Sequence, residues 1–213
     1  MSTRLEIVSD PVCPWCYLGA ANLMRAITAR EAHPFALVWR PFQLNPDMPP
    51  GGMDRDAYLS ARFKDPAQLE ATHTRLTAMG AEVGIAFRFE RVTRMPNTLD
   101  AHRLIRWAGT EGLQTRTAMA LFARYFEEGE DISDAGVLAG VAAEVGMDAA
   151  ATARLLAGDA DRAEVRAEAE AAGAMGVTGV PTFLIGGRYV VSGAQPPDLW
   201  TRLMDELEAA AGA

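Results

Sequence analysis

Two cysteines, Cys13 and Cys16, are the only thiols of the 213-residue chain, and they lie three positions apart in the run Cys13-Pro14-Trp15-Cys16. Disulfide exchange needs an attacking thiolate and a second thiol close enough to resolve the mixed disulfide. This spacing supplies both, with Cys13 as the nucleophile and Cys16 as the resolving thiol. Pro14 and Trp15 lie between the thiols and are the residues expected to tune their reactivity.

Two other interpretations of the cysteine pair are open. A C-x-x-C can be half of a zinc site, but the chain has no second pair, and His33, His73 and His102 show no ligand spacing. We therefore expect no metal. The cysteines could also be unreactive core residues, since buried cysteine is common. Their position between a predicted strand and a predicted helix favours redox chemistry.

The elements around the pair support this assignment. Residues 5–8 form a short apolar run that ends at Ser9-Asp10-Pro11, as expected of a buried strand. Apolar residues then recur at three- and four-residue spacing from Tyr17 to Ile27, which predicts a helix. Pro14 suits its first position, so Cys13 lies at the helix start, where unpaired N–H groups and the helix dipole stabilise a thiolate. Cys16 lies one turn deeper and is expected to be more buried.

The rest of the chain completes a β-α-β…β-β-α pattern. A second strand is predicted at residues 36–39, followed by a linker rich in proline and glycine at residues 43–52. A long helical block follows. Gly173, Gly176 and Gly179 then interrupt the helical pattern, before a β-hairpin at residues 182–185 and 188–191 and a closing amphipathic helix.

This order predicts an α/β protein in which strands from both chain ends share one sheet. The predicted division is a sheet domain of residues 1–53 plus 173–213, with an inserted all-helical domain of residues 54–172 between its parts. Within the insertion, the run Asp131-Ile132-Ser133-Asp134 is expected to start a helix that Gly146 ends, and Phe122, Tyr125 and Phe126 to share a helix face.

Composition excludes several classes of partner. The formal net charge is −8 and there is no basic run, so we expect no nucleic acid partner. No segment approaches the roughly 20 apolar residues of a membrane helix, so no membrane partner is expected. The first residues lack the pattern of a secretory signal, which predicts a cytoplasmic location. In that reducing compartment, a lone close cysteine pair is more often redox-active or metal-binding than structural.

Several longer stretches accompany the cysteine motif, in order, from one end of the chain to the other. They are residues 9–19 (SDPVCPWCYLG), 42–46 (FQLNP), 97–104 (NTLDAHRL), 125–132 (YFEEGEDI), 176–183 (GVTGVPTF) and 192–196 (SGAQP). Together they make the chain resemble the DsbA family of thioredoxin-fold proteins, most closely its FrnE-like branch.

The resemblance implies a thioredoxin fold interrupted by a helical domain. It also implies that Pro181 is a cis-proline beside the cysteines, where the backbone of Val180 would pair with a bound peptide or thiol. Asn97 and His102 are expected to line the cleft between the two domains. For His102, a buried histidine with its hydrogen bonds satisfied is an equally good interpretation.

The function implied is that of a thiol–disulfide oxidoreductase (dithiol–disulfide isomerase) acting on protein or small-molecule thiols and disulfides. It would need no cofactor beyond its own Cys13–Cys16 disulfide, with glutathione as a candidate co-substrate. Exposed helix faces are compatible with a homodimer. A second hypothesis is a glutathione-dependent isomerase or transferase, because the chain distantly resembles 2-hydroxychromene-2-carboxylate isomerases and kappa-class glutathione transferases, which carry serine where Cys13 stands. A third is a chaperone-like binding module.

Overall fold

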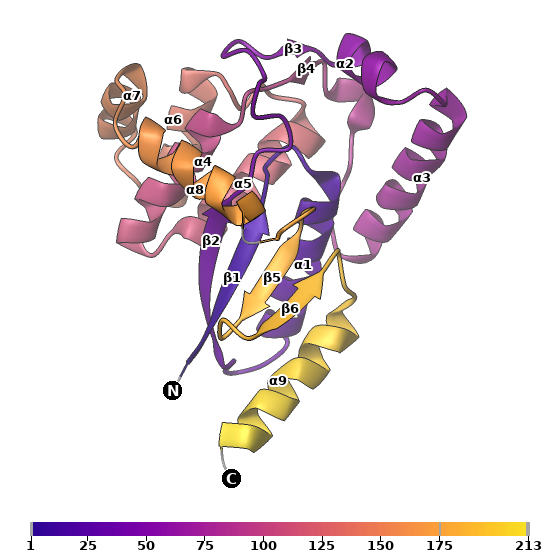
Figure 1. Cartoon of the computed structure of the whole chain (residues 1–213), viewed down its shortest axis with the longest axis vertical. Helices are drawn as coiled ribbons and strands as arrows, with labels where there is room; N and C mark the ends of the chain where they lie inside the picture. Colours follow the sequence, from indigo (N-terminus) through magenta and orange to yellow (C-terminus); the bar gives the residue numbers. More distant parts are fainter. Residues whose placement is uncertain (1, 175, 212–213) are drawn as a thin grey trace.

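A four-stranded mixed sheet in the order β2-β1-β5-β6 joins the two ends of the chain (Figure 1). The computed structural model describes residues 2–174 and 176–211. The strands are β1 (Thr3–Ser9), β2 (Phe35–Pro41), β5 (Thr182–Ile185) and β6 (Tyr189–Ser192). Strand β1 pairs in parallel with β2 and antiparallel with β5, so that Ile7 has Trp39 on one side and Phe183 on the other. Strands from both ends therefore share one sheet, as predicted.

Each face of the sheet is covered by helices. Paired residues on adjacent strands point to the same face, so Ile7 and Phe183 share one face while Val8 and Leu184 occupy the other. On the first face lie α1 (Pro14–Thr28) and α9 (Pro197–Ala211), where Trp200 meets the Phe183 ring edge-on with centroids 4.7 Å apart. On the second face, α8 (Arg162–Ala174) packs against Val8.

Most of the chain between β2 and β5 is helical. The helices are α2 (Arg55–Arg62), α3 (Pro66–Glu82), α4 (Leu99–Ala108), α5 (Gln114–Ala123), α6 (Ala135–Val145), α7 (Ala149–Ala157) and α8, with 3-10 turns at Phe89–Arg91 and Gly109–Glu111 and a π-helical turn at Arg124–Glu128. Helix α6 starts within the predicted run of residues 131–134 and ends at the predicted glycine: the Asp134 carboxylate accepts hydrogen bonds from its first amides, and Gly146 ends it with a φ of 101°. The predicted α/β thioredoxin fold with a large helical insertion is confirmed.

The expected all-helical insertion needs one correction. Two short strands pair antiparallel, β3 (Met53–Asp54) at the boundary of the insertion and β4 (Arg94–Met95) within it. Gly52 allows this pairing, since its φ is +65° and a Cβ there would lie 2.5 Å from the Met95 carbonyl oxygen. A second correction is that Gly173 lies inside α8 and does not end it. The glycine is exposed, and a helix tolerates one there at a cost of about 1 kcal/mol.

The hydrophobic core continues from the sheet into the helical segment. Tyr17 of α1 stacks on Phe122 of α5 with ring centroids 5.1 Å apart, and Phe87 meets Tyr17 edge-on at 5.7 Å.

The division into residues 1–53 plus 173–213 and residues 54–172 remains a proposal. In the part of the chain that the structure describes, none of the helices has the length and apolarity needed to cross a membrane.

Candidate active site

The two cysteines begin helix α1 directly after strand β1. Cys13 is the N-cap residue and Pro14 occupies the first helical position. The Cys13 amide donates to the Asp10 carbonyl at 2.9 Å, and the Cys13 carbonyl accepts from the Cys16 amide at 3.0 Å. Both thiols are free in this structure, and only 4% of Cys13 and 1% of Cys16 is exposed. Cys13 lines a pocket and Cys16 lies behind it, so Cys13 is the thiol that a ligand can reach.

The Val180–Pro181 segment lies directly against Cys13. The peptide bond between these residues is cis, as the family resemblance implied. The Cys13 thiol lies 3.7 Å from the Val180 carbonyl oxygen and donates to it. Pro181 packs on α1 at Gly19, where a Cβ would lie only 3.0 Å from the Pro181 ring. The start of the helix and the proline loop, 167 residues apart in the chain, therefore form one surface.

The environment of Cys16 holds that sulfur in its protonated form. Burial raises the pKa of the Cys16 thiol well above its ordinary value, and the hydrogen bond and charge of Cys13 raise it further. The backbone N–H of Asp10 opposes these effects. Cys16 must therefore lose its proton during the step in which it attacks.

The pocket that opens on Cys13 has a volume of about 440 Å³, and its walls come from distant parts of the chain. Trp15 contributes from α1, and the Arg75 guanidinium lies 5.6 Å from its ring centroid. Tyr58 of α2 borders the pocket and donates to the Asn45 side-chain oxygen at 2.9 Å. The wall is completed mainly by apolar and aromatic side chains: Val12, Leu44, Leu59, Phe63, Leu69, Leu76, Phe89, Met95, Tyr125, Phe126 and Val180.

A π-helical turn supplies two of these aromatic residues, Tyr125 and Phe126. The sequence predicted that both share a helix face with Phe122, and all three are buried. The turn is tied to the active-site helix, because the Tyr17 hydroxyl donates to Glu127. Burial and this carboxylate raise the pKa of Tyr17 far above its ordinary value, so the hydroxyl keeps its proton.

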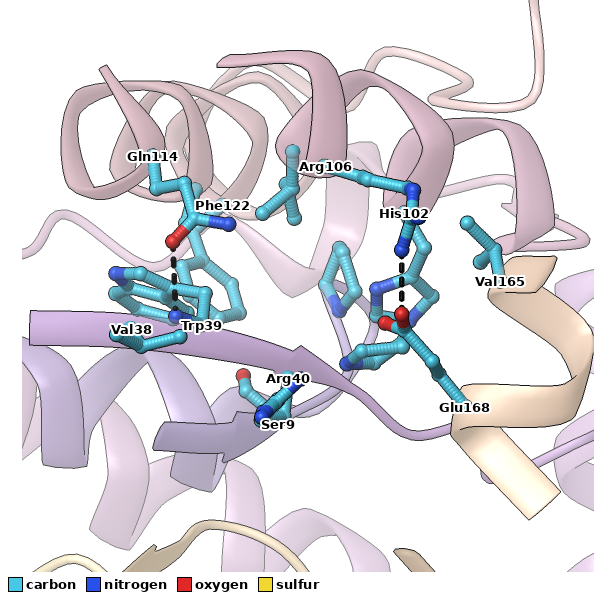
Figure 2. A pocket seen from close by; sticks show the side chains of 14 residues that line it. Ser9, Val38, Trp39, Arg40, His102, Arg106, Gln114, Phe122, Val165 and Glu168 are labelled. Carbon is cyan, nitrogen blue, oxygen red and sulfur yellow. Dashed lines mark hydrogen bonds and ion pairs between the residues drawn. The ribbon is translucent and has the colours of Figure 1, made fainter. Parts of the chain in front are cut away.

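Asn97 and His102 are not among the residues that line the Cys13 pocket, so the structure does not bring them together with the cysteines. The Asn97 side chain donates to the Met48 carbonyl and accepts from the Leu99 amide at 2.9 Å, so it ties the linker to the start of α4. Figure 2 shows His102 in a separate cavity between β2 and helices α4, α5 and α8.

The hydrogen bonding of His102 agrees with the alternative interpretation of a buried histidine, although the residue also borders this cavity between β2 and the inserted helices. Its Nε2 lies 3.0 Å from the Phe42 carbonyl oxygen and must carry the proton, because a carbonyl oxygen only accepts. The side chain is buried and its hydrogen bond is satisfied. The family resemblance placed His102 near the domain junction, but it could not tell on which side of the sheet the side chain would lie.

Asp10 is a residue whose role the sequence did not indicate. It is fully buried, and its carboxylate accepts from the Leu44 amide at 2.8 Å. It thereby fixes Leu44 at the rim of the pocket while its own carbonyl accepts from Cys13. An aspartate before a proline indicates a turn in sequence, and only the packing of the 42–45 segment over it reveals the burial.

Comparison with known proteins shows the family of this chain. The DSBA-like thioredoxin domain family matches residues 4–205, and the chain belongs to this family. A "probable DsbA oxidoreductase" from Streptomyces coelicolor is 32% identical, with a TM-score of 0.83 over 96% of this chain and 89% of that one.

Two further solved structures share the fold at lower identity. The cytosolic disulfide reductase DsbM from Pseudomonas aeruginosa, solved with GSH, is 22% identical, with a TM-score of 0.68 over 97% of this chain and 99% of its own. A 2-hydroxychromene-2-carboxylate isomerase is 18% identical, with a TM-score of 0.69 over 98% of this chain and 94% of its own. The chain is thus a DsbA-like thiol oxidoreductase by family.

Proposed function

We propose that this protein is a cytoplasmic dithiol–disulfide oxidoreductase that exchanges disulfides with protein or small-molecule thiols through Cys13 and Cys16. One observation carries the proposal: Cys13 lies at the start of α1, 3.7 Å from the Val180 carbonyl beside a cis Pro181, and faces a pocket with Cys16 buried behind it. A nucleophilic thiol and a resolving thiol are the groups that exchange requires, and the Val180 backbone is the edge beside which a peptide or thiol would bind.

The proposed exchange takes place in two steps. The Cys13 thiolate attacks one sulfur of a substrate disulfide, a Cys13–substrate disulfide forms, and the other substrate sulfur leaves as a thiolate. Cys16 then loses its proton and attacks the Cys13 sulfur, which releases the second substrate thiolate and leaves a Cys13–Cys16 disulfide. The reverse sequence oxidises a substrate dithiol, and the relative reduction potentials determine the direction. Glutathione is a candidate co-substrate that would return the pair to its starting state.

Removal of the resolving thiol tests this mechanism. Cys16→Ala should accumulate mixed disulfides on Cys13 with small thiols or cytosolic proteins, because the second step cannot occur. Cys13→Ser should form none and is the matched control. Non-reducing gels and mass spectrometry of the adducts provide the measurement, together with insulin reduction by the wild type. If Cys16→Ala traps nothing and the wild type exchanges no disulfide, the proposed function is wrong.

A glutathione-dependent isomerase would give a different pattern in the same experiment. Glutathione would bind without a covalent bond, and Cys16→Ala would retain full activity on an aromatic or electrophilic substrate. The thiol at position 13 favours exchange over this alternative, because a thiol can form the mixed disulfide that a serine cannot.

A further inference from the structure

The pocket in front of Cys13 combines apolar walls with a single arginine. Its lining includes no aspartate, glutamate or lysine, and Arg55 and His73 are its only side chains that can carry positive charge, among the described residues. Leu44 and Phe63 lie at its border and are 43% and 45% exposed. Exposed apolar side chains around a hollow mark a surface that binds an apolar group.

Arg55 is held in place by its neighbours at the start of α2. Its backbone amide donates to the Thr93 carbonyl at 3.0 Å. Its guanidinium lies 3.4 Å from His73 Nε2 and 6.0 Å from the Phe89 ring centroid. His73 in turn stacks on Phe89 with ring centroids 4.1 Å apart. The guanidinium is therefore kept on the aromatic wall of the pocket.

The positive charge of Arg55 has no carboxylate within 4.0 Å in residues 2–174 and 176–211. Arg55 also borders a second, adjoining hollow together with Glu70 and Glu90, and neither glutamate forms an ion pair with Arg55. Other half-buried arginines do have such partners: Arg106 pairs with Asp161 and Glu168. Burial of a charge without a partner is costly, so Arg55 is ready to bind an anion.

His73 does not add a second charge at this position. Burial lowers the pKa of His73, and the positive charge of Arg55 lowers it further, so the imidazole is neutral near pH 7 and accepts from the guanidinium. The pocket therefore presents one cation, set among aromatic rings.

We propose that the Cys13 pocket selects small thiols and disulfides that combine an aromatic or aliphatic body with a carboxylate, and that Arg55 binds this carboxylate. The inference rests on the proposed disulfide exchange and specifies its substrate class. Guanidinium and carboxylate form paired, charge-assisted hydrogen bonds of defined geometry. The apolar body would lie along the aromatic walls while its sulfur faces Cys13.

The test compares two disulfides of similar size and shape, one with charged and one with neutral ring substituents: bis(4-carboxyphenyl) disulfide and bis(4-carbamoylphenyl) disulfide. The reduced protein converts each disulfide into two aryl thiols and itself forms the Cys13–Cys16 disulfide. The two cysteine thiols supply both electrons, so no other reductant is needed. Stopped-flow absorbance of the aryl thiolate gives the rate constants. Each rate constant is divided by the rate constant for reduction of the same disulfide by dithiothreitol, a dithiol that has no binding pocket. This division removes differences in the intrinsic reactivity of the two disulfides.

We expect the normalised acid-to-amide ratio to exceed one in the wild type and to fall about tenfold in Arg55→Gln, the effect of losing one charge-assisted pair. Arg55→Lys keeps the charge and should retain an intermediate ratio. Arg62→Gln is the matched control, because Arg62 is an exposed arginine of the same helix that does not line the pocket. Its ratio should equal that of the wild type.

The inference fails if the wild-type ratio is one or less, or if Arg55→Gln and Arg62→Gln have the same ratio. In either case both reagents would still oxidise Cys13 and Cys16 to the disulfide. Failure of the proposed function looks different: neither reagent would generate a Cys13–Cys16 disulfide, which peptide mass spectrometry detects directly.

Discussion

At the scale of single residues, the two thiols of the pair have different roles because their surroundings differ. Cys13 lines the pocket and donates to the Val180 carbonyl, whereas Cys16 is buried and its pKa is raised by that burial. A neutral form that is favoured only in the folded protein makes stability depend on pH. The protonated Cys16 thiol contributes fully to the unfolding free energy below the pKa of an unfolded cysteine, about 8.5. This contribution is lost as the pH rises from there toward the raised pKa of Cys16 in the folded protein.

We therefore expect the reduced wild-type protein to lose about 1 kcal/mol of unfolding free energy between about pH 8.5 and 9.5, since the unfolded state releases the Cys16 proton first. Urea unfolding at several pH values in the presence of a reductant measures this loss. Cys16→Ala is the control and should show a smaller decrease over the same interval. Equal slopes in the two proteins would show that burial does not control this thiol.

At the scale of elements, the π-helical turn at Arg124–Glu128 is the feature that brings Tyr125 and Phe126 into the pocket. Such turns often occur at functional sites. Gly129 ends the turn with a φ of +77°, and a Cβ there would lie 2.5 Å from the Arg91 carbonyl oxygen. The turn thus depends on a residue without a side chain for two reasons, its left-handed backbone and its close approach to another segment.

Gly129→Ala should lower the unfolding free energy by about 2–4 kcal/mol, from a left-handed backbone cost of about 1–2 kcal/mol plus overpacking. The matched control is Gly112→Ala, because Gly112 has a φ of +72° and nothing within 4 Å of its Cβ position. The control should show the backbone cost alone. Chemical denaturation of both variants gives the comparison, and equal losses would exclude the close contact as a cause.

At the scale of the whole molecule, one core connects the sheet to the helical segment. Tyr17 of α1 packs against Phe87 and Phe122 from that segment and donates to Glu127. The Cys13 pocket has the same composite origin, with Val180 and Trp15 facing Tyr58 and Leu76. The site therefore requires both parts of the chain to be folded together. The expected homodimer stays a prediction.

This shared core predicts a single unfolding transition. Far-UV circular dichroism reports mainly on the helices, and tryptophan fluorescence reports in part on Trp39 in β2 and on Trp200 beside the sheet. We expect the two signals to give the same urea midpoint, as in a cooperative two-state transition. Two separate midpoints would show that residues 54–172 fold as an independent unit.

The sequence by itself determined the reactive pair and its local setting. A strand, an Asp-Pro turn and a proline at the first helical position are short-range signals, so the location of Cys13 at the start of α1 could be predicted from neighbouring residues. The order of strands at the two chain ends also predicted one shared sheet, because each strand must bury its apolar residues. Two boundaries did not follow from the sequence, since Gly173 lies inside α8 and the short β3–β4 pair interrupts the helical segment.

Tertiary structure decided which side chains surround the thiols. Arg55, His73 and Tyr125 reach the Cys13 pocket from helices and turns far along the chain, whereas His102 packs behind β2 and Asn97 joins the linker to α4. These positions follow from how the helices pack on one another and on the sheet. That packing is the sum of many long-range contacts, and residue spacing within a single segment carries no information about it.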